Sequence, residues 1–192
     1  MRIVAGKFRG RNLAKSDHLK SLRPTTDKNR EALFNILFSA KFIREVGFDL
    51  TDAAVLDVCC GSGAVAFEAL SRGAKSATLL DNSAIHLDLA RENARLLGVE
   101  NDVKILFADT KRLPRNEIFF NLIFIDPPYS VNYSEILKNL LNTGWIKKES
   151  LIVVEFDSIT LKKNPEHFSL ESFDLLDLRD YGKTSFAFLL LK

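Results

Sequence analysis

The feature that most constrains the fold is an alternation of short, continuous apolar runs with amphipathic stretches across the middle of the chain. The apolar runs are expected to be strands, and they cover residues 54–60, 76–81, 103–109, 121–126 and 150–156. The amphipathic stretches are expected to be helices, and the clearest cover residues 64–73 and 85–98. Strands that are apolar throughout are typical of a parallel sheet covered by helices on both faces. The alternation therefore predicts an α/β fold around a mostly parallel sheet.

The two ends of the chain depart from this pattern. Residues 167–192 hold two strand-like runs around Gly182, which predicts an antiparallel hairpin added to the sheet. Residues 1–23 are expected to be an extended or hairpin element, followed by a helix that begins after Pro24. The chain has 192 residues, of which 46% are hydrophobic, and this suits a single domain. Within it, we expect an N-terminal extension with the first helix over 1–40 and an α/β core over 53–192.

The net charge of +2 conceals an uneven distribution along the chain. Residues 1–30 hold nine Lys or Arg against two Asp, so this segment carries +7, and the remaining residues carry −5. Such a segment suits an arm that contacts a polyanion such as a nucleic acid. Basic residues that only keep an exposed N-terminus in solution would show the same pattern. The candidates for contact with phosphates are Lys7, Arg9, Arg11, Arg23 and Arg30.

Cysteine usage and the absence of long apolar runs limit the compartment and the partners. Cys59 and Cys60 are adjacent, so they cannot link distant parts of the chain, and a reduced, cytoplasmic protein is expected. The N-terminus lacks the apolar region of a secretory signal, and no apolar run approaches the roughly 18 residues that cross a bilayer. The three histidines are scattered, so no metal site is expected. Nothing in the sequence indicates a dimer surface, and a monomer is expected.

Four expected strands carry an aspartate at or near their carboxyl end, where parallel sheets bind ligands. These are Asp57, Asp81, Asp109 and Asp126, and Glu155 lies near the end of the fifth strand. A glycine turn with Gly61 and Gly63 follows the first strand and opens a helix, which allows a tight turn and a close approach of the backbone to a ligand.

The glycine turn is compatible with two kinds of cofactor. Residues 61–66 match the dinucleotide-binding pattern G-x-G-x-x-A, and Asp81 follows at a spacing that suits hydrogen bonds to ribose hydroxyls. An enzyme that uses a nicotinamide dinucleotide is therefore an alternative to an S-adenosylmethionine-dependent enzyme. Asp57 would repel a pyrophosphate, however, whereas it suits the ammonium group of S-adenosylmethionine (SAM). Asp109 could accept the adenine amino group. We therefore favour SAM as the cofactor.

The fourth strand ends in the tetrapeptide Asp126-Pro127-Pro128-Tyr129. The exocyclic amine of a nucleobase is a poor nucleophile, because its lone pair is delocalised into the ring. The Asp126 carboxylate and the Pro127 carbonyl could accept hydrogen bonds from that amine and direct its lone pair toward a methyl donor. The proline pair is rigid, and Tyr129 offers a face on which a base can stack. The motif therefore predicts methylation of an amino group on a base held outside its stack.

The chain resembles the RsmD-type bacterial 16S ribosomal RNA guanine-N2 methyltransferases along nearly its whole length. The matching blocks are MRIVAGKFRGRNL, LRPTTDKNREALFNIL, LDVCCGSGAVAFEALSRGA, FIDPPY with Tyr133 shortly after, LIVVE and YGKT. The resemblance implies a Rossmann-like, class I SAM-dependent methyltransferase that modifies the 2-amino group of one guanine in 16S rRNA, on a small-subunit assembly particle. It implies that residues 126–129 form the catalytic corner and that the four aspartates bind SAM together with Gly61 and Gly63. It also implies that the five basic residues named above contact RNA phosphates.

Other functions compete with this interpretation. The same chemistry could act on adenine N6, although 192 residues leave no room for a separate target-recognition domain. A ribosome-assembly protein that keeps the fold without turnover would show the same motifs. An oxidoreductase would leave the Asp-Pro-Pro-Tyr corner unexplained.

Overall fold

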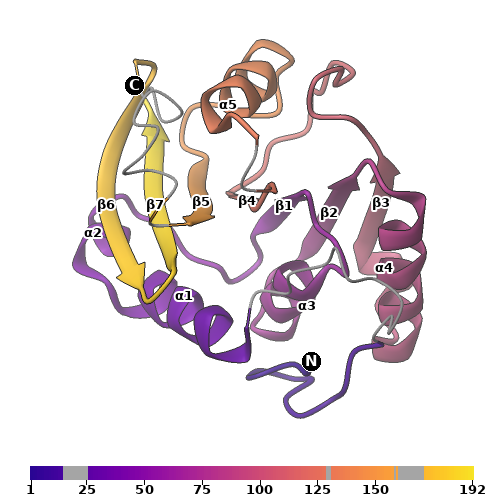
Figure 1. Cartoon of the computed structure of the whole chain (residues 1–192). Helices are drawn as coiled ribbons and strands as arrows, with labels where there is room; N and C mark the ends of the chain where they lie inside the picture. Colours follow the sequence, from indigo (N-terminus) through magenta and orange to yellow (C-terminus); the bar gives the residue numbers. More distant parts are fainter. Residues whose placement is uncertain (15–25, 129–130, 158, 160–170) are drawn as a thin grey trace.

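The computed structural model describes residues 1–14, 26–128, 131–157, 159 and 171–192. In this part of the chain, seven strands form one sheet in the order β3-β2-β1-β4-β5-β7-β6 (Figure 1). Strands β1 to β5 are parallel, whereas β7 is antiparallel to β5 and β6 is antiparallel to β7. Their bounds are β1 Ala54–Val58, β2 Ser76–Asp81, β3 Val103–Phe107, β4 Leu122–Ile125, β5 Leu151–Asp157, β6 Phe173–Tyr181 and β7 Thr184–Leu191. The mostly parallel sheet and its antiparallel C-terminal hairpin are confirmed.

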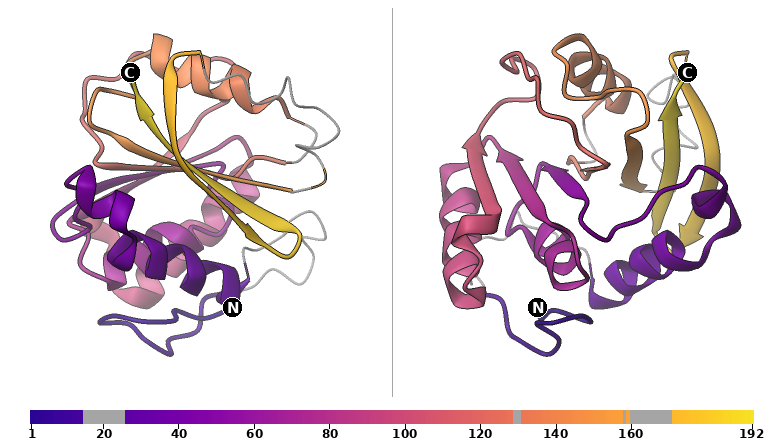
Figure 2. Two further views of the ribbon diagram at one scale, coloured as in Figure 1. Left: turned by 90° about the vertical axis from the view of Figure 1, so that its left-hand side faces the viewer. Right: turned by 180° about the vertical axis from the view of Figure 1, so that it is seen from behind.

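Helices cover both faces of the sheet, as the apolar strands predicted (Figure 2). Helices α1, α2, α3 and α4 lie on one face together with the N-terminal segment, and α5 lies on the other. The side chains of the central strands alternate between the two cores; Val55 and Val153 pack on the first face, while Leu56 and Ile152 pack on the second. The helices are α1 Asp27–Ser39, α2 Lys41–Glu45, α3 Ala64–Ser71, α4 Ala84–Leu97 and α5 Tyr133–Asn142, with a 3-10 turn, η1, at Glu100–Asp102.

Two helices were not predicted from sequence patterns. Helix α2 has five residues, too few for a periodic signal. Helix α5 begins at an Asn132 side chain that accepts a hydrogen bond from the Glu135 amide at 3.3 Å, and it buries Ile136, Leu137 and Leu140 against the second core. It covers the face that α3 and α4 leave open.

Residues 1–14 form a small hairpin, which we call the N-terminal hairpin. Its two arms are joined by the Arg2–Asn12 bridge, and the Ile3 amide donates to the Arg11 carbonyl at 3.0 Å. Ile3 and Leu13 are buried in the same core as α1 and α3. The hairpin therefore packs against the helix layer, beneath α3 and α4 in Figure 1. The expectation of an extended or hairpin element is confirmed for this stretch, while residues 15–23 lie outside the described residues.

Within the described residues, no helix has both the length and the apolar character that crossing a membrane requires.

Candidate active site

Five carboxylates line one cavity at the edge where the parallel strands end. From β3 to β5 they are Asp109, Asp81, Asp57, Asp126 and Glu155, so their order follows the order of the strands. The cavity has a volume of about 660 Å³. The structure thus brings together the four aspartates that the sequence placed at this edge, with Glu155 beside them.

Asp57 is buried in β1 beneath the first turn of α3. It is 2% exposed, and its Oδ2 atom accepts a hydrogen bond from the Ala66 amide at 3.2 Å. The pKa of Asp57 is raised to about 7; burial is the largest cause, the Ala66 hydrogen bond opposes it, and the charges of Asp126 and Asp81 contribute to the rise. Because the ionised form is costly here, a cationic ligand beside this carboxylate would stabilise it.

Asp81, at the end of β2, holds the glycine loop, which we define as residues 59–63. Its Oδ2 atom accepts from the Gly61 amide at 2.9 Å, and its Oδ1 atom accepts from the Ser83 amide at 2.9 Å. The Nδ1 atom of His86 lies 3.2 Å from the same Oδ1 atom. Sequence analysis gave His86 no role, because its spacing from Asp81 matches no motif.

Three amides at the glycine turn are already bound within the protein. A phosphate at a glycine turn takes hydrogen bonds from free amides of the loop and of the helix N-terminus. Here the Gly61 amide binds Asp81, the Ala66 amide binds Asp57, and the Gly63 amide donates to the Cys60 carbonyl at 2.8 Å. These three amides are not available to a phosphate, and the carboxylates that line the cavity favour a cationic ligand over a pyrophosphate.

Gly63 is required by packing. Its φ is +76°, and a Cβ atom there would lie 2.6 Å from both Leu79 Cδ2 and Phe67 Cε2. It is also absent from the residues that line the cavity, whereas Gly61 is among them. The groups that approach Gly63 belong to β2 and α3, and its contact with a cofactor stays a prediction.

The two cysteines stay protonated. Burial, together with the charges of the nearby aspartates, raises the pKa of Cys59 to about 12; the pKa of Cys60 is also raised well above its ordinary value, chiefly by burial. Neither thiol has the thiolate character that redox chemistry or metal binding needs. Among the described residues, no group of three or more His, Cys, Asp or Glu is placed to hold a metal ion.

The predicted catalytic corner follows β4 directly. The Asp126 amide donates to the Val58 carbonyl at 3.2 Å, which ties the corner to the end of β1. Asp126, Pro127 and Pro128 all line the cavity. Tyr129 lies outside the described residues.

The far side of the cavity is built by α1 and by the turn between β6 and β7. The Asn29 Nδ2 atom donates to the Thr184 Oγ1 atom at 2.9 Å, and Thr26 caps α1 by accepting from the Asn29 amide at 3.1 Å. These three residues and Lys183 line the cavity. Sequence analysis did not assign them to the site, because about 155 positions separate the two elements and only the tertiary fold joins them.

The predicted RNA-contacting cations have different environments. Lys7 and Arg9 are exposed on the N-terminal hairpin. Arg11 instead donates from its guanidinium to the Leu97 carbonyl at 3.3 Å and to the Leu96 carbonyl, so it caps the C-terminus of α4. Arg23 lies outside the described residues.

Arg30 is a correction to the sequence prediction. Its side chain is 0% exposed and pairs with Asp27 at 2.9 Å and with Glu68 at 3.6 Å. A guanidinium buried between two carboxylates is not available to an RNA phosphate. Its positive charge belongs to the interior of the protein.

Comparison with known proteins places this arrangement in a family. The family described as "Conserved hypothetical protein 95" matches residues 1–190. The ribosomal RNA small subunit methyltransferase D of Escherichia coli K12 is 38% identical over 81% of this chain and 74% of its own length. An uncharacterised methylase of Rickettsia prowazekii, RP545, is 31% identical and covers 86% of this chain and 90% of its own length.

The chain belongs to the RsmD-type methyltransferase family.

A solved structure agrees with this assignment. The candidate methyltransferase YhhF of Escherichia coli superposes with a TM-score of 0.81 at 29% identity, and the match covers 100% of this chain and 98% of that one. The sheet of this RsmD-type protein is thus the Rossmann-like methyltransferase fold, and its cofactor is S-adenosylmethionine. The cavity fits that cofactor, because buried Asp57 and Asp81 suit a ligand with cationic groups and hydroxyls.

Proposed function

We propose that this chain transfers a methyl group from SAM to the 2-amino group of a guanine in 16S ribosomal RNA, on an assembling small subunit. The observation that carries the proposal is the position of the Asp126-Pro127-Pro128 corner in the same cavity as Asp57 and Asp81. The names of relatives such as the Escherichia coli enzyme support the RNA substrate. The Asp-Pro-Pro corner supports an amino group as the acceptor.

The proposed cofactor contacts follow the strand order. Asp57 would pair with the ammonium group, Asp81 would accept hydrogen bonds from the ribose hydroxyls, and Asp109 would accept from the adenine amino group. Gly61 would form the wall of the loop beside the cofactor. When bound, SAM supplies an electrophilic methyl group.

The corner residues would prepare the acceptor. The Asp126 carboxylate and the Pro127 carbonyl would accept the two N–H groups of the guanine amine, which directs the nitrogen lone pair into the cavity. After the nitrogen gains the methyl group it must lose one proton, and Asp126 or water would take it. Pro128 would keep the corner rigid, and Tyr129 would stack on the base.

The acceptor base would enter on the side of Asn29, Thr184 and Lys183, which is the part of the cavity beyond β4. We also propose a monomer as the active form, as expected from the sequence. A protein that modifies assembling ribosomes in bacteria would work in the cytoplasm.

The function is tested by methyl transfer from radiolabelled SAM to small-subunit particles from cells that lack this protein and, in parallel, to naked 16S RNA. Label in N2-methylguanosine is the expected product after digestion to nucleosides. Label in N6-methyladenosine would keep the chemistry and overturn the acceptor. The absence of label with intact SAM binding would favour a protein that only binds the assembling ribosome.

The affinity for SAM should depend on pH through Asp57. Its pKa is about 7 in the free protein, and the ammonium group pairs only with the ionised carboxylate, so binding below pH 7 must release a proton. We expect the affinity to fall about tenfold for each pH unit below 7 and to be nearly constant above it. Titration calorimetry in buffers of different ionisation enthalpy measures both the affinity and the released proton. A constant affinity from pH 5.5 to 8 would contradict the assignment of Asp57 to the ammonium group.

A further inference from the structure

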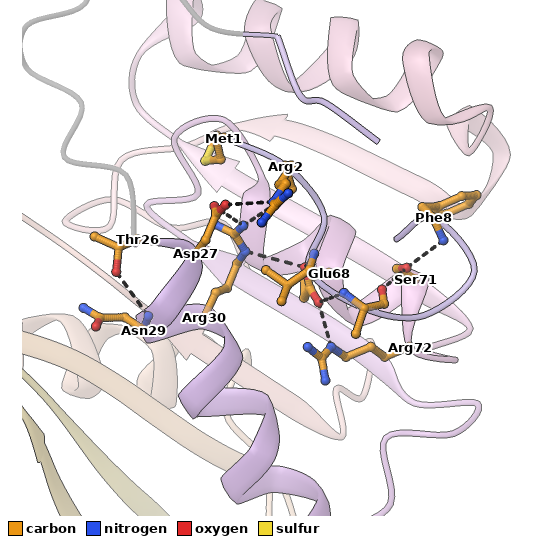
Figure 3. A network of polar contacts seen from close by, with 12 residues as sticks. Met1, Arg2, Phe8, Thr26, Asp27, Asn29, Arg30, Glu68, Ser71 and Arg72 are labelled. Atoms are coloured by element: carbon orange, nitrogen blue, oxygen red, sulfur yellow. Dashed lines mark hydrogen bonds and ion pairs between the residues drawn. The ribbon is translucent and has the colours of Figure 1, made fainter. Parts of the chain in front are cut away.

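Glu68 is a buried acid in α3 that the proposed mechanism does not use. It is 0% exposed, and its two oxygens accept hydrogen bonds from the Val4 amide at 2.8 Å and the Ala5 amide at 2.9 Å. The same carboxylate pairs with Arg72 at 2.7 Å and with Arg30 at 3.6 Å (Figure 3). A buried charge is tolerated only when such partners compensate its lost hydration. Two of these partners are backbone amides of the N-terminal hairpin, so Glu68 fixes the hairpin to α3.

Ser71 adds a second set of contacts one turn further along α3. Its carbonyl accepts from the Lys7 amide at 2.7 Å, and its Oγ atom accepts from the Phe8 amide at 2.9 Å and donates to the Ala5 carbonyl at 2.5 Å. The tip of the hairpin is therefore held through its main chain, and the side chain of Lys7 is exposed, with its Nζ atom 4.8 Å from the centroid of the Phe8 ring.

Gly6 shows how closely the two elements approach. Its φ is +80°, and a Cβ atom at this position would lie 1.9 Å from the Ser71 carbonyl oxygen. No side chain fits between the hairpin and α3. Gly10, on the same hairpin, has a φ of +82°, but a Cβ atom there would meet nothing within 4 Å.

The other end of the hairpin is tied to the glycine loop of the cofactor site. The Ala14 amide donates to the Asn93 Oδ1 atom at 2.6 Å, and the Asn93 Nδ2 atom donates to the Ser62 carbonyl at 3.0 Å. Asn93 is 0% exposed. The hairpin is thus anchored both at its tip and at its end, and the second anchor reaches the wall of the cavity.

We infer that Glu68 and Ser71 are positioning residues, which hold the N-terminal hairpin so that Lys7 and Arg9 meet the phosphates of the substrate RNA in a fixed arrangement. This inference rests on the proposed function, because it names the RNA contacts of that activity. Lys and Arg side chains supply such phosphate contacts, and these contacts set the register of a protein on its nucleic acid. Because the hairpin is already ordered in the free protein, RNA binding would not carry the free-energy cost of ordering it.

The inference is tested by Gly6→Ala, with Gly10→Ala as the matched control. Both substitutions introduce the same methyl group at a similar positive φ, but only the first displaces the hairpin from Ser71. We expect Gly6→Ala to raise the KM for small-subunit particles about tenfold with kcat within about twofold, and to reduce the slope of log affinity against log salt by about 2, since two phosphate contacts are lost. Gly10→Ala should keep both parameters within about twofold of the unsubstituted protein.

Two further measurements separate the possible outcomes. Hydrogen exchange at the Val4, Ala5 and Phe8 amides should be faster in Gly6→Ala and unchanged in Gly10→Ala. The double variant Lys7→Gln, Arg9→Gln should keep slow exchange and show the same reduced salt slope as Gly6→Ala. Equal particle affinity and salt slope in Gly6→Ala and Gly10→Ala, in a protein that transfers methyl groups, would overturn the inference alone. A protein that binds particles as expected but transfers no methyl group would overturn the proposed function and leave the positioning role standing.

Discussion

Methyl transfer should fall about a thousandfold in Asp126→Ala, while the affinity for SAM stays within a few-fold of the unsubstituted protein. The substitution removes the carboxylate proposed to orient the acceptor amine and to take its proton, and the loss of such a positioned group lowers a rate by about 10²–10⁴. The corner itself should persist, because it is held by the main-chain hydrogen bond from the Asp126 amide to Val58 and by the rigidity of Pro127 and Pro128.

Two measurements decide this prediction. Single-turnover transfer of labelled methyl groups to small-subunit particles gives the rate, and calorimetry gives the affinity for SAM. Asp102→Ala is the control, because Asp102 is exposed in η1 and does not line the cavity. A variant of Asp126 that no longer binds SAM would show that the corner is structural, and a variant with the full rate would remove Asp126 from the mechanism.

Asp57→Asn should weaken SAM binding about 30- to 100-fold and abolish its pH dependence. The variant loses a charge-assisted pairing with the ammonium group, which contributes roughly 2–3 kcal/mol. The asparagine side chain can still accept the hydrogen bond from the Ala66 amide, so the start of α3 should be preserved.

The same substitution should change the pH dependence of stability without SAM. The pKa of Asp57 is raised in the folded protein to about 7 from 3.8, so the folded state binds a proton that the unfolded state releases, and stability falls as the pH rises from about 4 to about 7. We therefore expect the Tm of Asp57→Asn, relative to the unsubstituted protein, to be higher at pH 8 than at pH 5. Thermal unfolding at both pH values measures this. Asp88→Asn, on an exposed site of α4, controls for surface charge. An equal difference in Tm at both pH values would show that Asp57 is not the group that titrates.

The strands of the sheet and the position of the site could be predicted from local patterns, whereas the order of the strands came from the structure. A buried strand needs apolar residues on both faces, so β1, β2, β4 and β5 are visible as continuous apolar runs. The carboxyl ends of parallel strands meet at one edge, so an aspartate at the end of each run is enough to place Asp57, Asp81, Asp109 and Asp126 in one cavity. The antiparallel hairpin was visible for the same reason, because two strand-like runs flank Gly182.

The far side of the cavity could not be predicted in this way. Asn29 belongs to the first helix and Thr184 to the last strand, and each is an ordinary polar residue in its own neighbourhood. Their hydrogen bond exists only because the tertiary fold places the start of α1 beside the start of β7. No periodicity within either element carries that information.

Taken by itself, the sequence determined the α/β class, the edge that binds the cofactor and the corner proposed for chemistry, because each of these depends on residue types at short spacing. The tertiary structure alone decided what each charge does. The sequence does not distinguish among the cations of the basic N-terminal segment. In the structure, however, Lys7 faces solvent, Arg11 caps α4, and Arg30 is buried against Glu68. The physical reason is that the energy of a charge depends on its hydration and its partners, and both are set by residues far away in the sequence.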